Sequence, residues 1–215
     1  MKFSRSGRKQ FIRQLLAPFV QTGWQKLTEV GMLTADHKRG KKFGSFGKGS
    51  FVSFPPGTIF NEHAIEIGSN TMIGPYVSLS AGMMPGQTLL REIIVSIGDR
   101  CMIGRGSHIV GHFGIEIEND VITGPYVYIT DQNHGYKDPD VPIWKQNPSD
   151  KGVHIGSGSW LGTQCVILPG AWIGKNVVIG AGAVVSGEIP DNCVVVGAPA
   201  RIVKRYFKDK GWVTI

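Results

Sequence analysis

From Ile155 onward, an apolar residue recurs at every sixth position of the chain. The consecutive units read IGSGSW, LGTQCV, ILPGAW, IGKNVV, IGAGAV and VSGEIP, and each begins with Ile, Leu or Val. The second residue is usually Gly, and the fifth is small or β-branched in all units but the last. A period of six is neither the helical period of about 3.6 residues nor a simple two-residue alternation. It predicts a short strand and a tight turn, repeated along a solenoid.

In such a solenoid the first residue of each unit points inward, and the fifth must be small because it faces the same narrow interior. We expect the glycine at the second position to supply backbone angles that are closed to other residues. Three units make one triangular coil, and stacked coils bury a continuous apolar column. The same pattern occurs earlier, in IGSNTM and IGPYVS from Ile67, IGDRCM and IGRGSH from Ile97, and IENDVI and TGPYVY from Ile117.

The repeat is interrupted at three places. Residues 81–96 leave the coil before Ile97 returns in phase, and the register slips by two between Ile115 and Ile117. From His134 to His154 the chain leaves the stack altogether. Insertions in a solenoid become loops on one face, which is often the binding face. We therefore expect chemistry where the rigid coil meets the loop at 135–154.

The flanks of the repeat have a different pattern. Residues 8–33 predict an amphipathic helix that breaks near Pro18, and residues 38–50 resemble a flexible basic linker. The tail ARIVKRYFKDK has a helical pattern with basic residues late in it. The predicted organisation is a basic helical cap and linker at 1–50, a β-helix domain at 51–200 with loops at 81–96 and 135–154, and a short C-terminal helix within 201–215.

The basic charge of the chain belongs to its N-terminal segment. Residues 1–50 hold 11 Lys and Arg against two acidic residues, whereas residues 51–215 hold 12 against 14. A nucleic-acid partner would require a basic excess in the folded body, so none is expected. The N-terminal segment is either a solvated cap or a surface helix attracted to anionic lipid, which leaves peripheral membrane contact open.

The three cysteines, Cys101, Cys165 and Cys193, have no CxxC spacing and indicate a reducing compartment without disulfides. The first two occupy fifth positions and are expected to fill the core. No apolar stretch reaches the roughly 20 residues of a membrane-spanning helix. FIRQLLAPFV would be a candidate signal core, but Arg13 interrupts it. We expect a cytoplasmic protein.

Two further stretches carry a family resemblance. The run NHGY, followed by DP, PI, Q and then IGSGSWLG, and the final portion AGAVVSGEIPDNCVVVGAPARIVK, resemble the hexapeptide-repeat acyltransferases of the maltose, galactoside and colanic-acid O-acetyltransferase branch. The resemblance implies an all-β fold, the left-handed parallel β-helix. It also implies a homotrimer with active sites at the subunit interfaces. The implied activity is coenzyme A-dependent transfer of an acyl group, acetyl in that branch, to a hydroxyl of a sugar or glycan.

The resemblance implies that His134 is the general base. Acyl transfer from a thioester to an alcohol requires the hydroxyl to lose its proton, and a neutral imidazole can take that proton and pass it to the leaving thiolate. A backbone N–H near Gly162 and Thr163 is the family-like donor to the oxyanion. The implied acceptor-binding residues are Asp131, Asn133, Tyr136 and Gln146.

For coenzyme A, the family places a groove along the C-terminal coils between neighbouring subunits, and no metal is required. The matching residues are Trp160, Gly162, Thr163, Ala181, Ser186, Arg201 and Lys204. Arg201 and Lys204 would attract the phosphates. Relatives commonly have a lysine after the Ser or Thr of a VVTKDIP-like segment, whereas this chain has Gly187. That phosphate contact is therefore in doubt.

Two other functions remain open. A zinc hydratase of the γ-carbonic-anhydrase kind has the same fold and would need three histidines, for which His108, His112 and His134 are available. A non-catalytic β-helix scaffold would show similar coils but would not need the histidine of the NHGY run. The sequence does not identify the acceptor, the length of the acyl group, or whether an oxygen or a nitrogen receives it.

Overall fold

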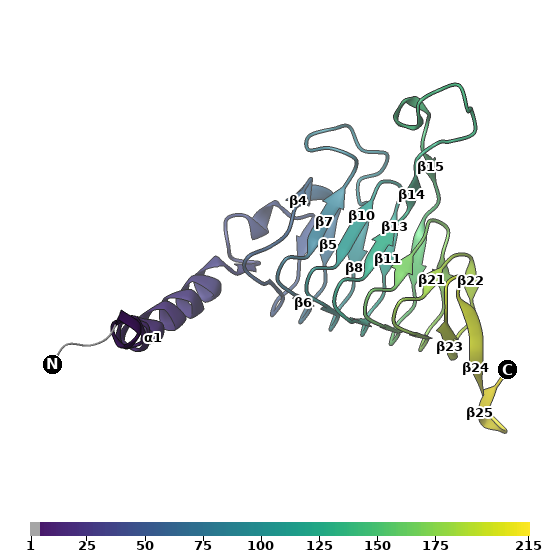
Figure 1. Cartoon of the computed structure of the whole chain (residues 1–215). Coiled ribbons are helices and arrows are strands. Elements are labelled where there is room, and N and C mark those ends of the chain that lie inside the picture. Colours follow the sequence, from purple (N-terminus) through teal and green to yellow (C-terminus); the bar gives the residue numbers. More distant parts are fainter. Residues whose placement is uncertain (1–4) are drawn as a thin grey trace.

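The structure, a computed structural model, describes residues 5–215, and its body is a triangular prism of short parallel strands (Figure 1). Successive strands pass from one face of the prism to the next, so each coil contributes to three sheets, which we name A, B and C. Strands of neighbouring coils pair in parallel, for example Ile97 with Ile117 and Ile117 with Ile155. The predicted β-helix of six-residue units is confirmed.

The strands of each sheet are given in spatial order. Sheet A contains β1 (Leu33–Thr34), β3 (Phe51–Val52), β6 (Met72–Ile73), β9 (Met102–Ile103), β12 (Ile122–Thr123), β17 (Trp160–Leu161), β20 (Val178–Ile179), β23 (Cys193–Val196), β24 (Arg201–Phe207) and β25 (Gly211–Thr214). Sheet B contains β2 (Ser45–Phe46), β5 (Ile65–Ile67), β8 (Val95–Ile97), β11 (Ile115–Ile117), β16 (Val153–Ile155), β19 (Trp172–Ile173) and β22 (Glu188–Ile189). Sheet C contains β21 (Val184–Val185), β18 (Val166–Ile167), β13 (Tyr128–Thr130), β10 (His108–Gly111), β7 (Ser78–Ala81) and β4 (Ile59–Phe60). A separate ribbon pairs β14 (Gln132–Asn133) with β15 (Ser149–Asp150), and three short 3-10 helices are η1 (Gly40–Lys42), η2 (Glu62–Ala64) and η3 (Ile143–Lys145).

The interior of the prism is the predicted apolar column. The first residues of the units, such as Ile155 and Ile173, are fully buried, and each such side chain stabilises the fold by about 1.5–3 kcal/mol. The fifth residues, such as Ala171 and Ala183, are buried as well. The three cysteines are free and buried, as predicted for Cys101 and Cys165, and burial raises the pKa of the Cys165 thiol to about 12.

The reason for the glycine at the second position differs from our expectation. Gly68 and Gly156 do not have positive φ angles, which instead occur two residues later, at Asn70 and Gly158. A Cβ on Gly156 would lie 2.6 Å from the carbonyl carbon of Gly174 in the next coil. The second position therefore requires glycine because neighbouring coils approach closely at the turn, and not because of its backbone angles.

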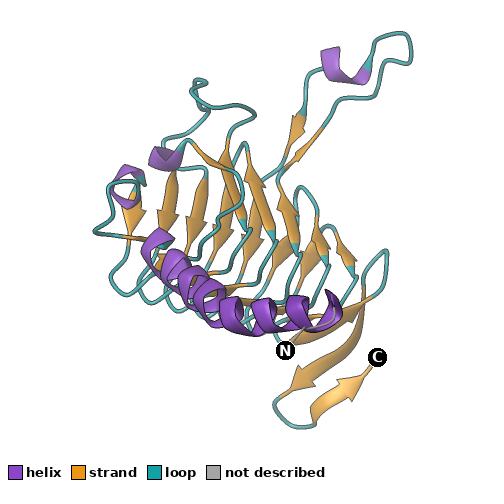
Figure 2. Cartoon of the chain, turned by 60° about the vertical axis from the view of Figure 1, so that its left-hand side comes forward, coloured by secondary structure: helices purple, strands orange, loops and turns teal. Residues whose placement is uncertain are grey.

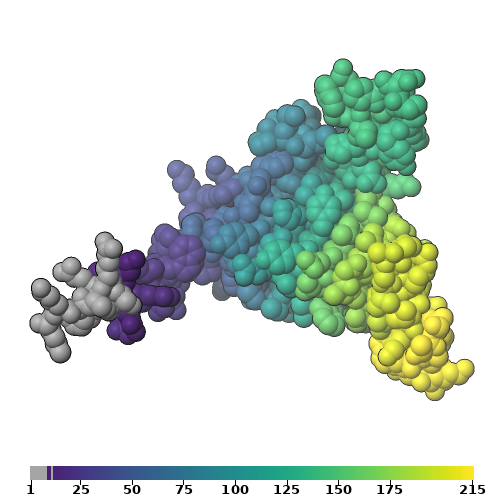
Figure 3. All heavy atoms as spheres, viewed as in Figure 1, coloured from purple at the N-terminus to yellow at the C-terminus, as the bar shows by residue number. Residues whose placement is uncertain are grey.

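The predicted interruptions leave the prism at one edge, where the chain passes from sheet C to sheet B. We call this edge the C–B corner; it comprises residues 61–64, 82–94, 112–114, 131–152, 168–171 and 186–187. The two-residue slip lies in the turn at 112–114, between β10 and β11. The long loop at 134–148 projects from this corner above the prism (Figures 1 and 3).

The N-terminal helix α1 (Arg5–Gly31) is continuous, so the predicted break near Pro18 is wrong. Proline removes one backbone hydrogen bond, and on this exposed helix water can bond the carbonyl that is left unpaired. The helix extends away from the end of the prism that holds the first coil (Figures 1 and 2). Residues 1–4 of the predicted basic cap lie outside the described residues.

The expected flexible linker at 38–50 is in fact the first coil of the prism. Phe43 and Ser50 are buried, and β2 pairs in parallel with β5. The N–H of Gly47 donates to the carbonyl of Ile67 at 2.7 Å. This coil satisfies backbone groups of the next coil that would otherwise face water, although its sequence lacks the Ile-Gly repeat.

The predicted C-terminal helix is wrong, because residues 201–214 form an antiparallel hairpin, β24 and β25. β24 pairs with the outer edge of β23, with Val194 opposite Lys204 and Val196 opposite Arg201. Gly211, with φ of 68°, follows the turn that leads back to β25. The hairpin covers the last strand of the solenoid, which would otherwise expose an unpaired edge. In the described part of the chain, no helix has the length and apolar character needed to cross a membrane.

Candidate active site

The predicted catalytic histidine lies at the C–B corner, at the start of the projecting loop. His134 directly follows β14, and a groove of about 470 Å³ runs between residues 133–137 and 146–149 on the two arms of the loop. Its lining includes His134, Asn133, Tyr136 and Gln146, so four of the predicted residues are brought together. Tyr136 is three-quarters exposed and His134 is also exposed.

The imidazole of His134 is not committed to a structural role. His37, His112 and His154 each have a hydrogen-bond partner, whereas within residues 5–215 no group bonds the ring of His134. Gly135 is required beside it, because a Cβ there would collide with the carbonyl oxygen of Asn147 on the opposite arm. The close approach of the two loop arms at Gly135 therefore holds the backbone beside His134, while the imidazole ring makes no hydrogen bond in the described chain.

Asp131 does not line the groove, so its predicted role in binding the acceptor is not supported by its position. Its side chain is fully buried. Its carboxylate accepts the N–H groups of His112, Phe113 and Gly114 at 2.8, 2.9 and 2.6 Å. These bonds satisfy the amides of the turn that contains the two-residue insertion. Asp131 therefore fixes the corner from which the loop departs.

A second pair, which the sequence did not indicate, holds the other end of the loop. The Nδ1 atom of His112 lies 2.9 Å from a carboxylate oxygen of Asp150, and both side chains are largely buried. Asp150 is on β15, opposite Gln132 of β14. His112 and Asp150 are 38 residues apart, so only the coil geometry brings them together. With Asp131, this pair positions both strands at the root of the loop.

Gln146 lines the groove, but its amide is already used within the loop. Its Nε2 donates to the carbonyls of Asp138 and Val141 at 2.8 Å, and its Oε1 accepts the N–H of Asp138 at 3.1 Å. Gln146 thus braces the loop, and the predicted acceptor contact by its amide is not supported by this geometry. Asn133 and Tyr136 remain the candidate acceptor contacts.

Most of the predicted coenzyme A residues lie on sheet A or beside it. The ladder places Trp160, Val178, Val194 and Lys204 in one row across neighbouring strands. Trp160 and Lys204 are both exposed. A Cβ on Gly162 would lie 2.6 Å from the N atom of Ala181. Thr163 accepts the N–H of Gly182 at 2.9 Å.

These contacts place Gly162, Thr163 and Ala181 at the edge where the chain passes from sheet A to sheet C, which we call the A–C corner. Arg201 opens β24 at the same end of the sheet. The N–H of Gly162 donates to the carbonyl of Ile179 at 2.7 Å and is thus already used. Of the two N–H groups predicted to bind the oxyanion, only that of Thr163 is therefore still a candidate.

Ser186 is separated from the other coenzyme A residues. It lies between β21 and β22, at the same C–B corner as the loop of His134. Its neighbour Gly187 has a φ of 77°, in the left-handed region, where a side chain would be strained. The backbone angle at residue 187 therefore suits the glycine of this chain and would be strained with the lysine that relatives have there.

The predicted site residues therefore form two groups at different corners of one chain. His134, Asn133, Tyr136 and Ser186 belong to the C–B corner. Trp160, Gly162, Thr163, Ala181, Arg201 and Lys204 belong to sheet A and the A–C corner. One chain does not bring the predicted general base and the predicted coenzyme A residues to the same place.

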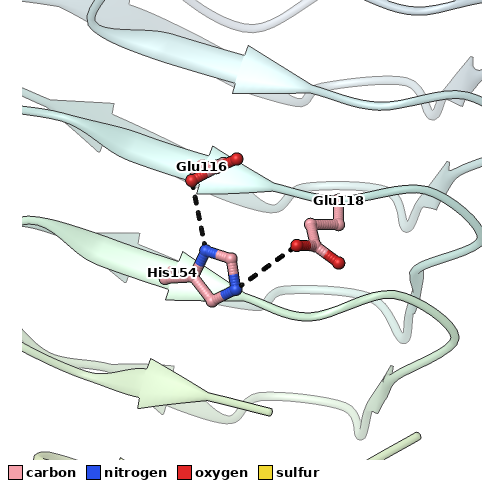
Figure 4. Close-up of side chains that lie close together, drawn as sticks. All are labelled: Glu116, Glu118 and His154. Atoms are coloured by element: carbon pink, nitrogen blue, oxygen red, sulfur yellow. Dashed lines mark hydrogen bonds and ion pairs between the residues drawn. The ribbon is translucent and has the colours of Figure 1, made fainter. Parts of the chain in front are cut away.

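Another polar cluster lies on the outer surface of sheet B (Figure 4). His154 stands opposite Glu116 in the ladder, with Nδ1 3.2 Å from Glu116 and Nε2 3.6 Å from Glu118. Its ring stacks on Trp172 with centroids 4.1 Å apart. Hydrogen bonds from the hydroxyl and N–H of Ser157 hold the pKa of Glu118 below its usual value.

The cluster also bears on metal binding. Among residues 5–215, Glu116, Glu118 and His154 are the group whose ligand atoms lie close enough for one ion, within 4.8 Å of one another. The two ring nitrogens face different carboxylates, however, so the donors do not converge on one point (Figure 4). The histidines of the zinc-hydratase alternative, His108, His112 and His134, do not form such a group in the described chain. The arrangement within one chain gives that alternative no support.

Comparison with known proteins identifies the class. A family model described as bacterial transferase hexapeptide (six repeats) matches residues 152–187, and one described as hexapeptide repeat of succinyl-transferase matches residues 94–130. WbbJ of Escherichia coli (strain K12), assigned as a lipopolysaccharide biosynthesis O-acetyl transferase, is 32% identical over 158 residues, which cover 70% of this chain and 76% of WbbJ. The galactoside O-acetyltransferase of Lactococcus lactis is 34% identical over 149 residues, covering 59% of this chain and 70% of the relative.

A solved structure shows the same fold. The N-acyltransferase AntD of Bacillus cereus, in a complex with dTDP and coenzyme A, aligns with a TM-score of 0.68 and 21% identity over 83% of this chain and 92% of AntD. The chain belongs to the hexapeptide-repeat acetyltransferases, in the O-acetyltransferase branch that its sequence resembles. The predicted left-handed parallel β-helix and the predicted acyltransferase class are confirmed.

Proposed function

We propose that the protein transfers an acetyl group from acetyl-coenzyme A to a hydroxyl of a sugar or glycan, with His134 as the general base. The observation that carries this proposal is the exposed, uncommitted imidazole of His134 in a groove of about 470 Å³, in a chain of the acetyltransferase family. The names of WbbJ and of the galactoside enzyme indicate a saccharide acceptor for those relatives. The exposed Asn133 and Tyr136 offer an amide and a phenol to such an acceptor.

His134 would serve both halves of the reaction. As the acceptor oxygen attacks the thioester carbonyl, a C–O bond forms and the neutral imidazole takes the hydroxyl proton. Collapse of the tetrahedral intermediate breaks the C–S bond, and the imidazolium returns the proton to the leaving thiolate. The products are an acetyl ester and a free thiol, and the histidine ends neutral as it began. The N–H of Thr163 would stabilise the oxyanion between these steps.

The donor side of the site fits coenzyme A. Trp160 presents an exposed indole beside the narrow turns of Gly162 and Ala181, where side chains are too small to obstruct an extended pantetheine arm. Arg201 and Lys204 are exposed cations at the far end of this surface and suit the phosphates. The bound donor supplies the activated acyl group, and these residues would hold it.

We infer further that a homotrimer completes the site. His134 and the donor residues lie at different corners of one prism, so a neighbouring copy is needed to bring them together. The outward row of sheet A supports this arrangement because it is apolar throughout: Phe51, Met72, Met102, Ile122, Trp160, Val178 and Val194. Monomeric proteins rarely leave so large an apolar surface in water. Ile143 and Trp144 at the tip of the loop are also exposed and would reach the neighbour.

The test is release of free thiol from acetyl-coenzyme A in the presence of a panel of mono- and oligosaccharides. General-base catalysis contributes roughly 10²–10⁴-fold, so His134→Ala should lower kcat by that factor without lowering the melting temperature. The matched control is His63→Ala, another exposed histidine, which lies in η2 at the same corner but on an earlier coil of the prism. Full activity of His134→Ala toward an accepted sugar would contradict the proposed role.

A further inference from the structure

The helix α1 carries a broad apolar face that no other element of the described chain covers. Phe19 is 73% exposed and Val30 is 80% exposed, and the neighbouring apolar side chains are at least half exposed. These exposed side chains are Ile12, Leu15, Leu16, Phe19, Val20, Trp24, Leu27 and Val30. The helix extends from the prism instead of packing on it (Figures 1 and 2). Such a patch marks an interaction site.

Basic side chains lie along this apolar face and not opposite it. Positions 9, 12, 16, 19, 23, 26 and 30 follow one another at spacings of three and four, so they share one side of the helix. They read Lys, Ile, Leu, Phe, Gly, Lys and Val. The opposite side has the uncharged glutamines Gln10, Gln14, Gln21 and Gln25. Glu29 is the only acidic residue in the helix sequence, against five basic residues.

Along the row from Lys9 to Val30, a second copy of the helix is a poor partner. A coiled coil needs apolar residues at successive positions of its seam. In this row Lys9 and Lys26 would bury charge in the seam, and Gly23 would leave a gap. Only Ile12, Leu16 and Phe19 are contiguous. The neighbouring row at positions 16, 20, 23, 27 and 30 has no charged residue, but each copy carries five basic residues against one acidic residue, and like charge opposes pairing. A flat apolar layer that is bounded by charged groups could accept this side of the helix. The apolar side chains would enter the layer, and the long side chains of Lys and Arg would reach its charged boundary.

We propose that α1 binds the surface of a membrane that contains anionic lipid. The apolar side chains would enter the boundary between headgroups and acyl chains, and Lys9, Arg13 and Lys26 would contact the anionic headgroups. The glutamine side would face water. The helix would lie in the plane of the surface, since it lacks the apolar character needed to cross the bilayer. This inference does not rest on the proposed acyl transfer.

The test is co-sedimentation of the full chain with vesicles of phosphatidylcholine alone or with about one-third phosphatidylglycerol. We expect binding to the anionic vesicles that weakens with added salt, because exposed charges are screened. Each basic residue at such a surface contributes about 1 kcal/mol, or roughly fivefold in affinity. The triple variant Lys9→Gln, Arg13→Gln, Lys26→Gln should therefore bind on the order of a hundredfold more weakly.

A second triple variant, Leu16→Gln, Phe19→Gln, Val20→Gln, should lose at least about tenfold in affinity while it keeps a good helix former at each position. Its matched control is Gln14→Ala, Gln21→Ala, Gln25→Ala on the opposite side, which should bind like the parent chain. In the parent chain, vesicles should shift the fluorescence of Trp24 to the blue, and Trp24→Phe should remove that part of the shift.

Two results would overturn the proposal. One is equal binding of the parent chain to neutral and anionic vesicles, or no binding to either. The other is a fall in the solution mass of the Leu16, Phe19 and Val20 variant without vesicles, which would show that the apolar face packs against a second copy. Neither result depends on acyl transfer, so thiol release with a soluble sugar separates this proposal from the proposed function.

Discussion

The inward-facing residues of sheets A and B follow the same apolar pattern, but the outward-facing residues of the two sheets differ in polarity. The inward residues of both are buried aliphatic side chains such as Leu161 in sheet A and Ile155 in sheet B. The outward row of sheet B contains Glu66, Glu116 and Glu188, and its histidine is held by carboxylates and by Trp172. The outward row of sheet A is apolar from Phe51 to Val194. The inward positions specify the fold, and the outward positions give sheets A and B different surfaces.

The difference extends to the candidate site. On sheet B, the carboxylates of Glu116 and Glu118 pair with His154. Sheet A carries the exposed Trp160 and Lys204, which we propose as part of the donor groove. His134, the proposed general base, lies at the C–B corner, which is the one corner of the prism that sheet A does not border. A site between two copies explains why one chain leaves both an apolar face and an uncommitted histidine.

The largest effect is expected from a lysine placed on the outer row of sheet A. Ile122→Lys should dissociate the proposed trimer, because a charge buried without a partner costs several kcal/mol. The matched control is Glu188→Lys, which places the same side chain on the outer row of sheet B and should leave the mass unchanged. Light scattering after gel filtration distinguishes the two. A trimer that survives Ile122→Lys would show that sheet A is not the interface.

A smaller effect is expected at the C–B corner. Asp150→Asn should lower the free energy of unfolding by about 1.5–3 kcal/mol, since hydrogen bonds to charged groups contribute that much. It should also lower kcat more than it raises KM, because the root of the His134 loop loses its brace. Urea denaturation and steady-state kinetics measure the two effects. Unchanged kinetics in a destabilised variant would limit the His112–Asp150 pair to a structural role.

The smallest effect concerns the polar face of sheet B. The pKa of Glu118 is lowered from its usual value of 4.5 by the bonds from Ser157. A carboxylate with a lowered pKa stabilises the fold above its unfolded-state pKa and loses that contribution as the pH falls through the folded-state pKa. Glu118→Gln should therefore reduce the melting temperature near pH 7, and this effect should shrink as the pH falls below 4.5, through the lowered folded-state pKa. A difference that grows on acidification would contradict this assignment.

The sequence predicted the core better than the ends of the prism, for a physical reason. The inward Ile, Leu and Val repeat every six residues, so local pattern alone identifies them. The segment IVKRYF at 202–207 suits a helix or a strand, and the free edge of β23 decides between them. The coil at 44–52 has no Ile-Gly units and is recognised only by its pairing with β5 and β6.

The residues of the candidate site were also predicted only in part. The motif located His134, Asn133 and Tyr136 correctly beside one groove. Asp131 and Gln146 belong to the same stretch of sequence, but their polar atoms are taken by the turn at 112–114 and by Asp138. Whether a polar atom of the motif is already hydrogen-bonded depends on residues that fold against the motif. The brace between His112 and Asp150 was missed for that reason, because the 38-residue separation has no local signature.

The most direct test of the central claim, a site shared between copies, is complementation between two inactive variants. His134→Ala removes the base, and Ala181→Trp obstructs the donor groove. If each site takes its base from one chain and its donor groove from the next, randomly mixed trimers should recover about one quarter of the parent activity. If each chain holds a complete site, the mixture should stay as inactive as its two components, and the account would be wrong.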